Sequence, residues 1–257
     1  MSCIKRRRKG RGFAYYHPNG QRISDRDEIE RLNSVGVPPA YTEVCYSRSP
    51  HRKVLATAKD GRDKTQYWYN KTFVKTNRNR KFHRMVRFGQ DLPRIRSAIK
   101  KMMRSPDPDT RGNGIALSLM DRCHFRPGNK KYKRSNGSYG ATTLDRRHIK
   151  IKPHSVHISF RGKSGVQNVC TVHDSTLRQA LRRNITKIKG SSPVALNMFL
   201  SPYTSKDVRT WGANALFLKN LRRNGLYAGG KTRLVKAIAA TASAIGNTPG
   251  VCKKHYI

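Results

Sequence analysis

The chain has 257 residues, and its 55 Lys and Arg against 14 Asp and Glu give a formal net charge of +41 at pH 7. A globule of that charge repels itself, so we expect a polyanionic partner, with nucleic acid as the first candidate. High charge also typifies disorder, but 36% of the residues are hydrophobic and several stretches are periodic, which favours folded domains with basic surfaces. No apolar run approaches the roughly 18–20 residues that cross a bilayer, so we expect no membrane partner. No apolar segment follows the basic N-terminal residues, so we expect no secretory signal.

The N-terminal segment, residues 1–76, has the alternating and aromatic pattern of a small β-rich domain. Its basic residues 1–9 are predicted to form an arm that lies on DNA. Residues 70–80 are polar and basic without apolar periodicity, which is typical of a linker. Strands are predicted at residues 41–46, 54–58 and 66–69.

From residue 77 onward the pattern is mainly helical. Asp91-Leu92-Pro93 has the cap and the early proline that begin a helix. A hairpin is predicted where apolar residues alternate at 156, 158 and 160 and Gly162-Lys163-Ser164-Gly165 turns the chain. Further helices are predicted at 115–120, from Asp174 or Ser175 through Ile185 and Ile188, from Thr204 or Ser205 to a stop at Asn224-Gly225, at 231–245, and in a short turn from Thr248-Pro249 that carries Tyr256.

The cysteines and carboxylates argue against a metal site. The five cysteines are odd in number and widely spaced, with no CxxC motif, so we expect neither a disulfide framework nor zinc, and a reducing compartment. Two-metal phosphoryl chemistry needs converging carboxylates, whereas the pair Asp107 and Asp109 lies in a proline-rich turn. Any attack on a phosphodiester is therefore expected to use cationic side chains, without metal or cofactor.

A metal-free attack on DNA needs three kinds of group. A nucleophile must reach phosphorus, cations must balance the charge on two non-bridging oxygens, and an acid must protonate the leaving 5′ oxygen. Guanidinium groups suit these oxygens because they are planar, always charged and bidentate. A tyrosine can be the nucleophile where nearby cations favour its phenolate, whose reference pKa is about 10.

Five blocks of this sequence, in one order, resemble the poxvirus-like and bacterial type IB DNA topoisomerases. The resemblance covers nearly the whole chain and includes two arginine motifs, a lysine hairpin and a C-terminal tyrosine motif. The blocks are Val37–Val44 with Ala56–Tyr69, Asn136–Leu144, Phe160–Gly165, Lys206–Gly212, and Ile245–Pro249 with Val251–Tyr256.

The resemblance implies an enzyme that relaxes supercoiled duplex DNA. One strand is cleaved through a 3′-phosphotyrosyl intermediate, rotates and is religated, without ATP, metal or a small-molecule cofactor. By the same resemblance Tyr256 is the nucleophile, Arg126 and Arg209 bind the non-bridging oxygens, and Lys163 is the general acid. Asn247 gives a further hydrogen bond to the phosphate. Poxvirus members carry His at that position, so Asn247 indicates the bacterial type.

The resemblance also implies DNA-binding residues and a DNA clamp. Gln66, Tyr67 and Tyr69 resemble contacts from the small domain, and Lys131 and Tyr132 resemble contacts around the catalytic phosphate. The implied fold is α+β, with a β-rich N-terminal domain (1–76) and a mainly α-helical catalytic domain (77–257). A monomer is expected to encircle double-stranded DNA. The expected location is intracellular and DNA-associated, in a bacterial cytoplasm or nucleoid, or in the virion or host cell of a large DNA virus.

Two alternative functions remain open from the sequence. A tyrosine site-specific recombinase also uses Arg, Lys, Arg and Tyr, but such enzymes typically carry His three residues before the second arginine, where this chain has Lys206. A non-enzymatic basic protein of the DNA-packaging or ribosomal kind would explain the charge, but it gives no reason for five ordered blocks.

Overall fold

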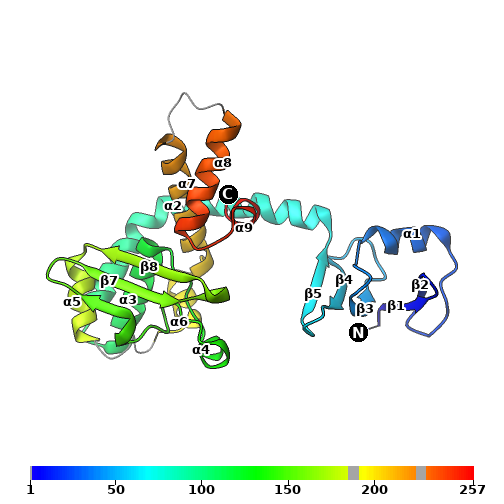
Figure 1. The fold of residues 1–257 in the computed structure, drawn as a ribbon, viewed down its shortest axis with the longest axis horizontal. Coiled ribbons are helices and arrows are strands. Elements are labelled where there is room, and N and C mark those ends of the chain that lie inside the picture. The colour runs from blue at the N-terminus through cyan, green and yellow to red at the C-terminus, as the bar shows by residue number, and fades with distance from the viewer. Residues whose placement is uncertain (1, 185–190, 224–229) are drawn as a thin grey trace. The chain divides into compact units, whose positions relative to one another are not determined.

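The computed structural model describes residues 2–184, 191–223 and 230–257, and the chain divides into two compact units, residues 1–83 and 84–257 (Figure 1). Both units contain helices and antiparallel strands, which confirms the predicted α+β class. The boundary predicted between residues 76 and 77 lies inside α2 (Lys71–Arg104), a helix that begins in the first unit and ends in the second.

The first unit is a five-stranded antiparallel sheet with one helix. The strand order is β2-β1-β3-β4-β5. The core contains Tyr15 and Tyr46, whose rings meet edge to face, and Leu32 from the helix. The elements are β1 (Ile4–Lys9), β2 (Gly12–Tyr16), α1 (Arg26–Ser34), β3 (Thr42–Tyr46), β4 (Val54–Lys59) and β5 (Thr65–Tyr69).

The basic N-terminus is a strand, so the expectation of a free arm over residues 1–9 is wrong. β1 pairs with β2 on one side and β3 on the other, and Ile4 is buried in the core. Alternate side chains of a strand point to opposite faces. A charged segment can therefore join the sheet through its paired backbone and a single buried side chain. The arginine and lysine side chains of β1 then lie on the surface of the sheet.

The expected linker at residues 70–80 and helix start at Asp91 are also wrong. Both segments belong to the single helix α2, with Pro93 inside it. Lysine and arginine are good helix formers, so the segment needs no apolar stripe to continue a helix that is anchored further on. That anchor consists of the buried residues of α2, all at or after position 85: Met85, Phe88, Leu92, Ile99 and Met103.

The second unit packs helices around a three-stranded sheet. The sheet has the order β6-β7-β8, and α7 and α8 lie side by side beyond it (Figure 1). Its core centres on α3, whose residues 115–120 are all buried. The remaining elements are α3 (Pro108–Cys123), α4 (Lys130–Asn136), β6 (Ile149–Ile151), β7 (Val156–Arg161), β8 (Gln167–Val172), α5 (Ser175–Arg183), α6 (Pro193–Leu200), α7 (Ser205–Arg223), α8 (Gly230–Ala244) and α9 (Pro249–His255).

Two disulfides contradict the prediction that the cysteines do not pair. Cys3 bonds Cys45 within the first unit, and Cys123 at the end of α3 bonds Cys170 in β8. The partners are 42 and 47 residues apart, and it is strand pairing and helix packing that bring them together. Spacing along the sequence carries no signal for such pairs. Cys252 is a buried free thiol.

Some expectations fall outside the described residues, namely Ile185, Ile188 and the stop at Asn224-Gly225. Within the described part of the chain, every helix is too short or too polar to pass through a bilayer.

Candidate active site

Tyr256 is held at both ends by α7. It directly follows α9, a short helix that begins at Pro249 after the side-chain cap of Thr248. Arg209 Nε donates to the Tyr256 hydroxyl at 3.2 Å, and Asn214 Nδ2 donates to the Tyr256 carbonyl at 2.8 Å. The phenol and the backbone of the residue are therefore both fixed to one helix.

Arg209 is nearly inaccessible, with 3% of its surface exposed. Its two terminal nitrogens donate to the backbone carbonyls of His124 and Ile245. These carbonyls precede the Arg126 loop and the Asn247 loop, so one guanidinium joins three segments that are distant in sequence. Burial, followed by the nearby charge of Arg126, lowers the pKa of Arg209. A guanidinium nonetheless stays charged at neutral pH.

The start of α7 is fixed by a buried carboxylate. Asp207 accepts hydrogen bonds from the backbone N–H and the hydroxyl of Thr204, the residue before the helix. Its other oxygen pairs with Arg84 at 3.0 Å. This cap places the helix, and with it Arg209, as the sequence predicted from Thr204 or Ser205.

Arg126 and Asn247 meet although they are 121 residues apart. Arg126 Nη2 donates to Asn247 Oδ1 at 2.6 Å. The Arg126 loop is held by the Ala141 N–H, which donates to the Arg126 carbonyl at 2.8 Å, and by the close approach of Gly140. The amide nitrogen of Asn247 is buried and makes no hydrogen bond of normal geometry with the described residues. An unsatisfied donor at this place can bind an anion.

The Tyr256 phenol has a lowered pKa. Burial alone raises the pKa, but the charge of Arg209, its hydrogen bond and the charge of Arg126 outweigh burial, and the Asn247 amide adds to the lowering. The net result is a pKa below the usual value of 10, because the surrounding cations stabilise the phenolate. The groups around this tyrosine therefore favour its phenolate more than water does.

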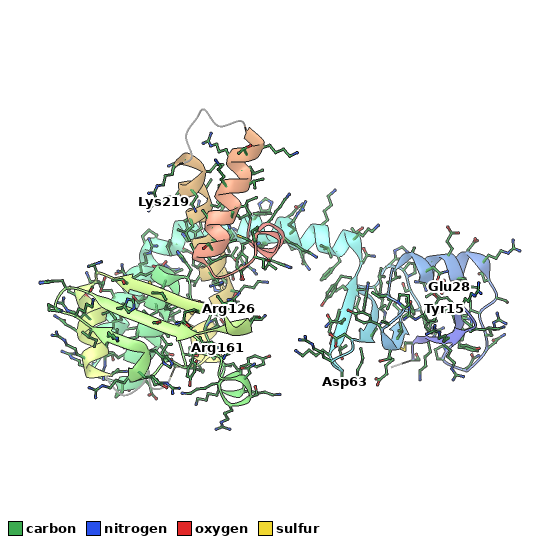
Figure 2. All side chains as sticks on the ribbon, in the orientation of Figure 1. Tyr15, Glu28, Asp63, Arg126, Arg161 and Lys219 are labelled. Carbon is green, nitrogen blue, oxygen red and sulfur yellow. A yellow bond between two sulfur atoms is a disulfide. The ribbon has the colours of Figure 1, made fainter. Side chains whose placement is uncertain are left out.

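The side chain of Lys163 makes no hydrogen bond to any of these four residues. It is exposed in a short 3₁₀ turn, Lys163–Gly165, that joins β7 to β8. The hairpin does reach the tyrosine motif, because Val166 and Asn168 pack against the Gly246 backbone. The structure thus brings Arg126, Arg209, Asn247 and Tyr256 together and leaves Lys163 on an exposed turn beside them (Figure 2 labels Arg126).

The predicted DNA-binding residues are on two exposed surfaces, one in each unit. In β5, Tyr67 and Tyr69 are 53% and 48% exposed with stacked rings, while Gln66 is half-buried and donates to Asp60. In α4, Lys131 is exposed and Tyr132 is 58% exposed. Tyrosines of this kind, accessible and beside basic residues, are suited to contact nucleic acid.

Two residues of the site were not predicted from the sequence. His124 accepts from Arg209 through its carbonyl, and Asn214 holds the Tyr256 carbonyl. The sequence contains only a weak indication that Asn214 belongs to the site, namely its place five residues after Arg209 on the same predicted helix. For His124 the only indication was its nearness to Arg126 in the sequence. It acts through its backbone carbonyl, which every residue type has, so its identity does not reveal the contact.

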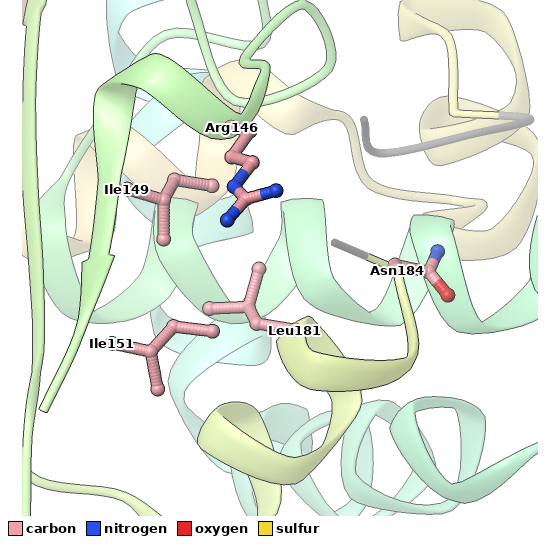
Figure 3. A pocket seen from close by; sticks show the side chains of 5 residues that line it. All are labelled: Arg146, Ile149, Ile151, Leu181 and Asn184. Atoms are coloured by element: carbon pink, nitrogen blue, oxygen red, sulfur yellow. The ribbon is translucent and has the colours of Figure 1, made fainter. Parts of the chain in front are cut away.

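A cavity of about 200 Å³ lies away from this site. Three aliphatic side chains, Asn184 and the guanidinium of Arg146 line it, and no predicted site residue contributes (Figure 3). Among the described residues, His, Cys, Asp and Glu side chains form no group of three or more that could hold a metal ion. Asp107, from the pair predicted to lie in a turn, caps α3 by accepting from the Thr110 N–H.

The family comparison decides what kind of protein carries this site. The model of the eukaryotic DNA topoisomerase I catalytic core matches residues 70–256, and the model of the bacterial DNA topoisomerase IB N-terminal domain matches residues 12–63. The chain belongs to the type IB DNA topoisomerases. It is an enzyme of the isomerase class. The recombinase and packaging alternatives have no support from these matches.

Viral relatives of this topoisomerase are similar over most of its length. The DNA topoisomerase 1B of Acanthamoeba polyphaga mimivirus is 27% identical, covering 100% of this chain and 85% of the relative. The DNA topoisomerase 1B of vaccinia virus (strain Copenhagen) is 29% identical, covering 91% of this chain and 80% of the relative. The DNA topoisomerase 1 of rabbit fibroma virus is 24% identical, covering 89% and 78%.

Proposed function

We propose that this topoisomerase relaxes supercoiled duplex DNA by reversible transesterification at Tyr256. The phenolate oxygen attacks phosphorus, forms a 3′-phosphotyrosyl bond and displaces the 5′ oxygen. The free end rotates, and its hydroxyl attacks the same phosphorus to restore the strand. The bond energy is kept in the phosphotyrosine, so neither ATP nor metal is required. The observation that carries the proposal is the Tyr256 hydroxyl 3.2 Å from Arg209 Nε.

Arg126, Arg209 and Asn247 would stabilise the charge that develops on the non-bridging oxygens. A guanidinium has five N–H donors, and Arg209 uses three of them in the contacts already described. Two remain for a phosphate oxygen. The half-buried Arg126 and the unsatisfied amide of Asn247 provide further donors on the opposite loops. Such preorganised donors are usually the largest single contribution to catalysis.

Lys163 would protonate the leaving 5′ oxygen. An ammonium on an exposed turn can reach a phosphate held at Tyr256 if the hairpin closes on DNA. The neighbouring Ser164 and Gly165 both have positive φ, so the turn is tight and brings the lysine to its tip. On religation the neutral amine takes the proton back from the 5′ hydroxyl.

Both units would contact the same duplex, as a monomer that closes around it. Gln66, Tyr67 and Tyr69 would bind from the first unit, and Lys131 and Tyr132 from the second. The location that this proposal implies is inside the cell, on DNA, in a bacterium or in the host or virion of a large DNA virus. The viral relatives support such a setting.

The decisive test compares wild-type protein with Tyr256→Phe. Wild-type protein is expected to relax a plasmid in excess EDTA without ATP, and to leave a covalent protein–DNA adduct when denatured with SDS. Tyr256→Phe is expected to bind the same DNA with unchanged affinity and to form no adduct, because only the attacking oxygen is removed. An adduct in that variant would place the nucleophile elsewhere. Relaxation that requires paired sites would indicate a recombinase.

A further inference from the structure

His124 occupies a strained position between the core of the second unit and the site. It is the residue that ends α3, with φ +55° and ψ 28°, in the left-handed region that few side chains adopt. Cys123 before it is bonded to β8, and Arg126 follows two residues later. The turn at His124 therefore directs the chain from a fixed helix into the Arg126 loop.

The backbone of His124 contacts Arg209 directly. Its carbonyl accepts the hydrogen bond of Arg209 Nη1, and Ile245 accepts from Nη2 on the other side. The direction of this carbonyl follows from the left-handed φ and ψ, because rotating the residue into the helical region would turn the carbonyl away. The two carbonyls thus set how the Nε edge of the guanidinium faces the Tyr256 hydroxyl.

The imidazole of His124 contacts the same helix one turn later. A Cβ placed on Gly212 would lie 2.2 Å from His124 Nδ1 and 2.6 Å from Cε1, so the ring occupies the space of a side chain there. Gly212 is three residues after Arg209, and residues three apart share a helix face. His124 therefore contacts α7 at two consecutive turns, through its carbonyl and through its ring.

The ring is suited to this place only while it is neutral. Its Nδ1 is buried and has no hydrogen-bond partner among the described residues. Burial lowers the pKa of His124, Asp121 on α3 opposes that shift, and Arg209 on α7 adds to it. At neutral pH the imidazole is uncharged, and it does not repel the guanidinium that it packs beside.

We propose that His124 is a positioning residue that sets the Arg209 guanidinium against the Tyr256 phenol. The inference rests on the proposed role of Tyr256 and adds a residue that acts through Arg209. Its carbonyl orients the guanidinium, and its ring holds the distance between α3 and α7. The backbone of the Arg126 loop is thereby fixed relative to Arg209.

Three variants test the role of the ring and leave the left-handed turn at residue 124 possible. His124→Gly allows the left-handed turn but removes the ring, His124→Asn allows the turn and keeps a neutral polar group, and Gly212→Ala forces the ring away. With protein in excess over labelled duplex DNA, His124→Gly is expected to form the covalent adduct about tenfold more slowly than wild type, with unchanged DNA affinity. Asparagine is expected to restore part of the rate.

The double variant tests the packing itself. Gly212→Ala is expected to slow adduct formation about tenfold in the wild-type background and to have little effect in the His124→Gly background, where the space is open. An equal effect of Gly212→Ala in both backgrounds would overturn the proposal. So would a His124→Gly variant that forms the adduct at the wild-type rate.

A measurement that does not require activity accompanies these rates. In full-length protein labelled with ¹³Cζ-tyrosine, His124→Gly is expected to raise the pKa of the Tyr256 phenol, because the guanidinium no longer faces it. An unmoved titration would overturn the inference. If wild-type protein forms no adduct at all, the proposed function falls, and this titration still decides the role of His124. Urea unfolding of each variant shows whether it is folded.

Discussion

The Tyr256 phenol shows how neighbouring side chains set the pKa of a single residue. Burial opposes ionisation of its phenol, yet Arg209 and Arg126 outweigh burial and lower the pKa. Below that pKa the phenol is neutral and a weak nucleophile, so each pH unit gained increases the phenolate fraction about tenfold. Above it the fraction is constant. The rate of cleavage should therefore rise with pH through an inflection that lies below pH 10 and then level off.

Substitutions at Arg126 test the electrostatic origin of this shift. Arg126→Gln removes a charge that lowers the phenol pKa, so the inflection of cleavage rate against pH is expected to move to higher pH. Arg126→Lys keeps the charge and is expected to leave the inflection near its wild-type position, although the planar guanidinium and its hydrogen bond to Asn247 are lost. Single-turnover adduct formation between pH 6 and 10 measures both. Equal inflections in wild type and Arg126→Gln would contradict the role of the charge.

The candidate site residues were predicted from sequence motifs, but the contacts between them could not be predicted. The motifs contain Arg126, Arg209, Asn247 and Tyr256, and the structure joins them through side chains 121 and 47 residues apart. No local spacing predicts such pairs. The contacts of Arg209 with backbone carbonyls were equally hidden, since any residue can supply a carbonyl.

Elements with a strict pattern were the ones that could be predicted. The alternation at residues 156, 158 and 160 gave β7, and Asp174 indeed caps α5. Elements that consist mostly of charged residues were not predicted, because their apolar pattern is too sparse to recognise. α1 was missed although Asp25 caps it and Ile29 and Leu32 are spaced for one helix face, because its other residues are mostly charged or polar. Residues 70–80 were wrongly predicted to be a linker for the same reason.

The disulfide between α3 and β8 stabilises the element that leads into the Arg126 loop. Closing a loop of 47 residues restricts the unfolded chain, so Cys123→Ser with Cys170→Ser is expected to lower the free energy of unfolding by about 3–4 kcal/mol. Urea unfolding measures the loss. The matched pair Cys3→Ser with Cys45→Ser alters only the first unit and serves as control. An unfolding midpoint that reductant does not change would show that Cys123 and Cys170 are free thiols.

Net charge is the property of the whole molecule that governs its binding to DNA. At +41, the chain neutralises many phosphates and releases their counterions. For roughly six to ten phosphate contacts, affinity is expected to fall by about 10³–10⁵ between 50 and 200 mM salt. Fluorescence anisotropy with a labelled duplex measures the slope. A slope near zero would mean that the basic surfaces of the two units do not meet the DNA backbone.

The double attachment of Tyr256 to α7 has a mechanical consequence. A swivelling duplex exerts torque on the protein through its single covalent link, and here that link would be the phenolic oxygen of Tyr256, which lies against Arg209, on a residue whose carbonyl is held by Asn214 of the same helix. The pull would travel along α7 to Asp207 and its pair with Arg84, a route that ends in α2 beside the buried Met85. The force during strand rotation would thus act on α7, which is packed against the core, rather than on the short helix α9 that precedes the tyrosine.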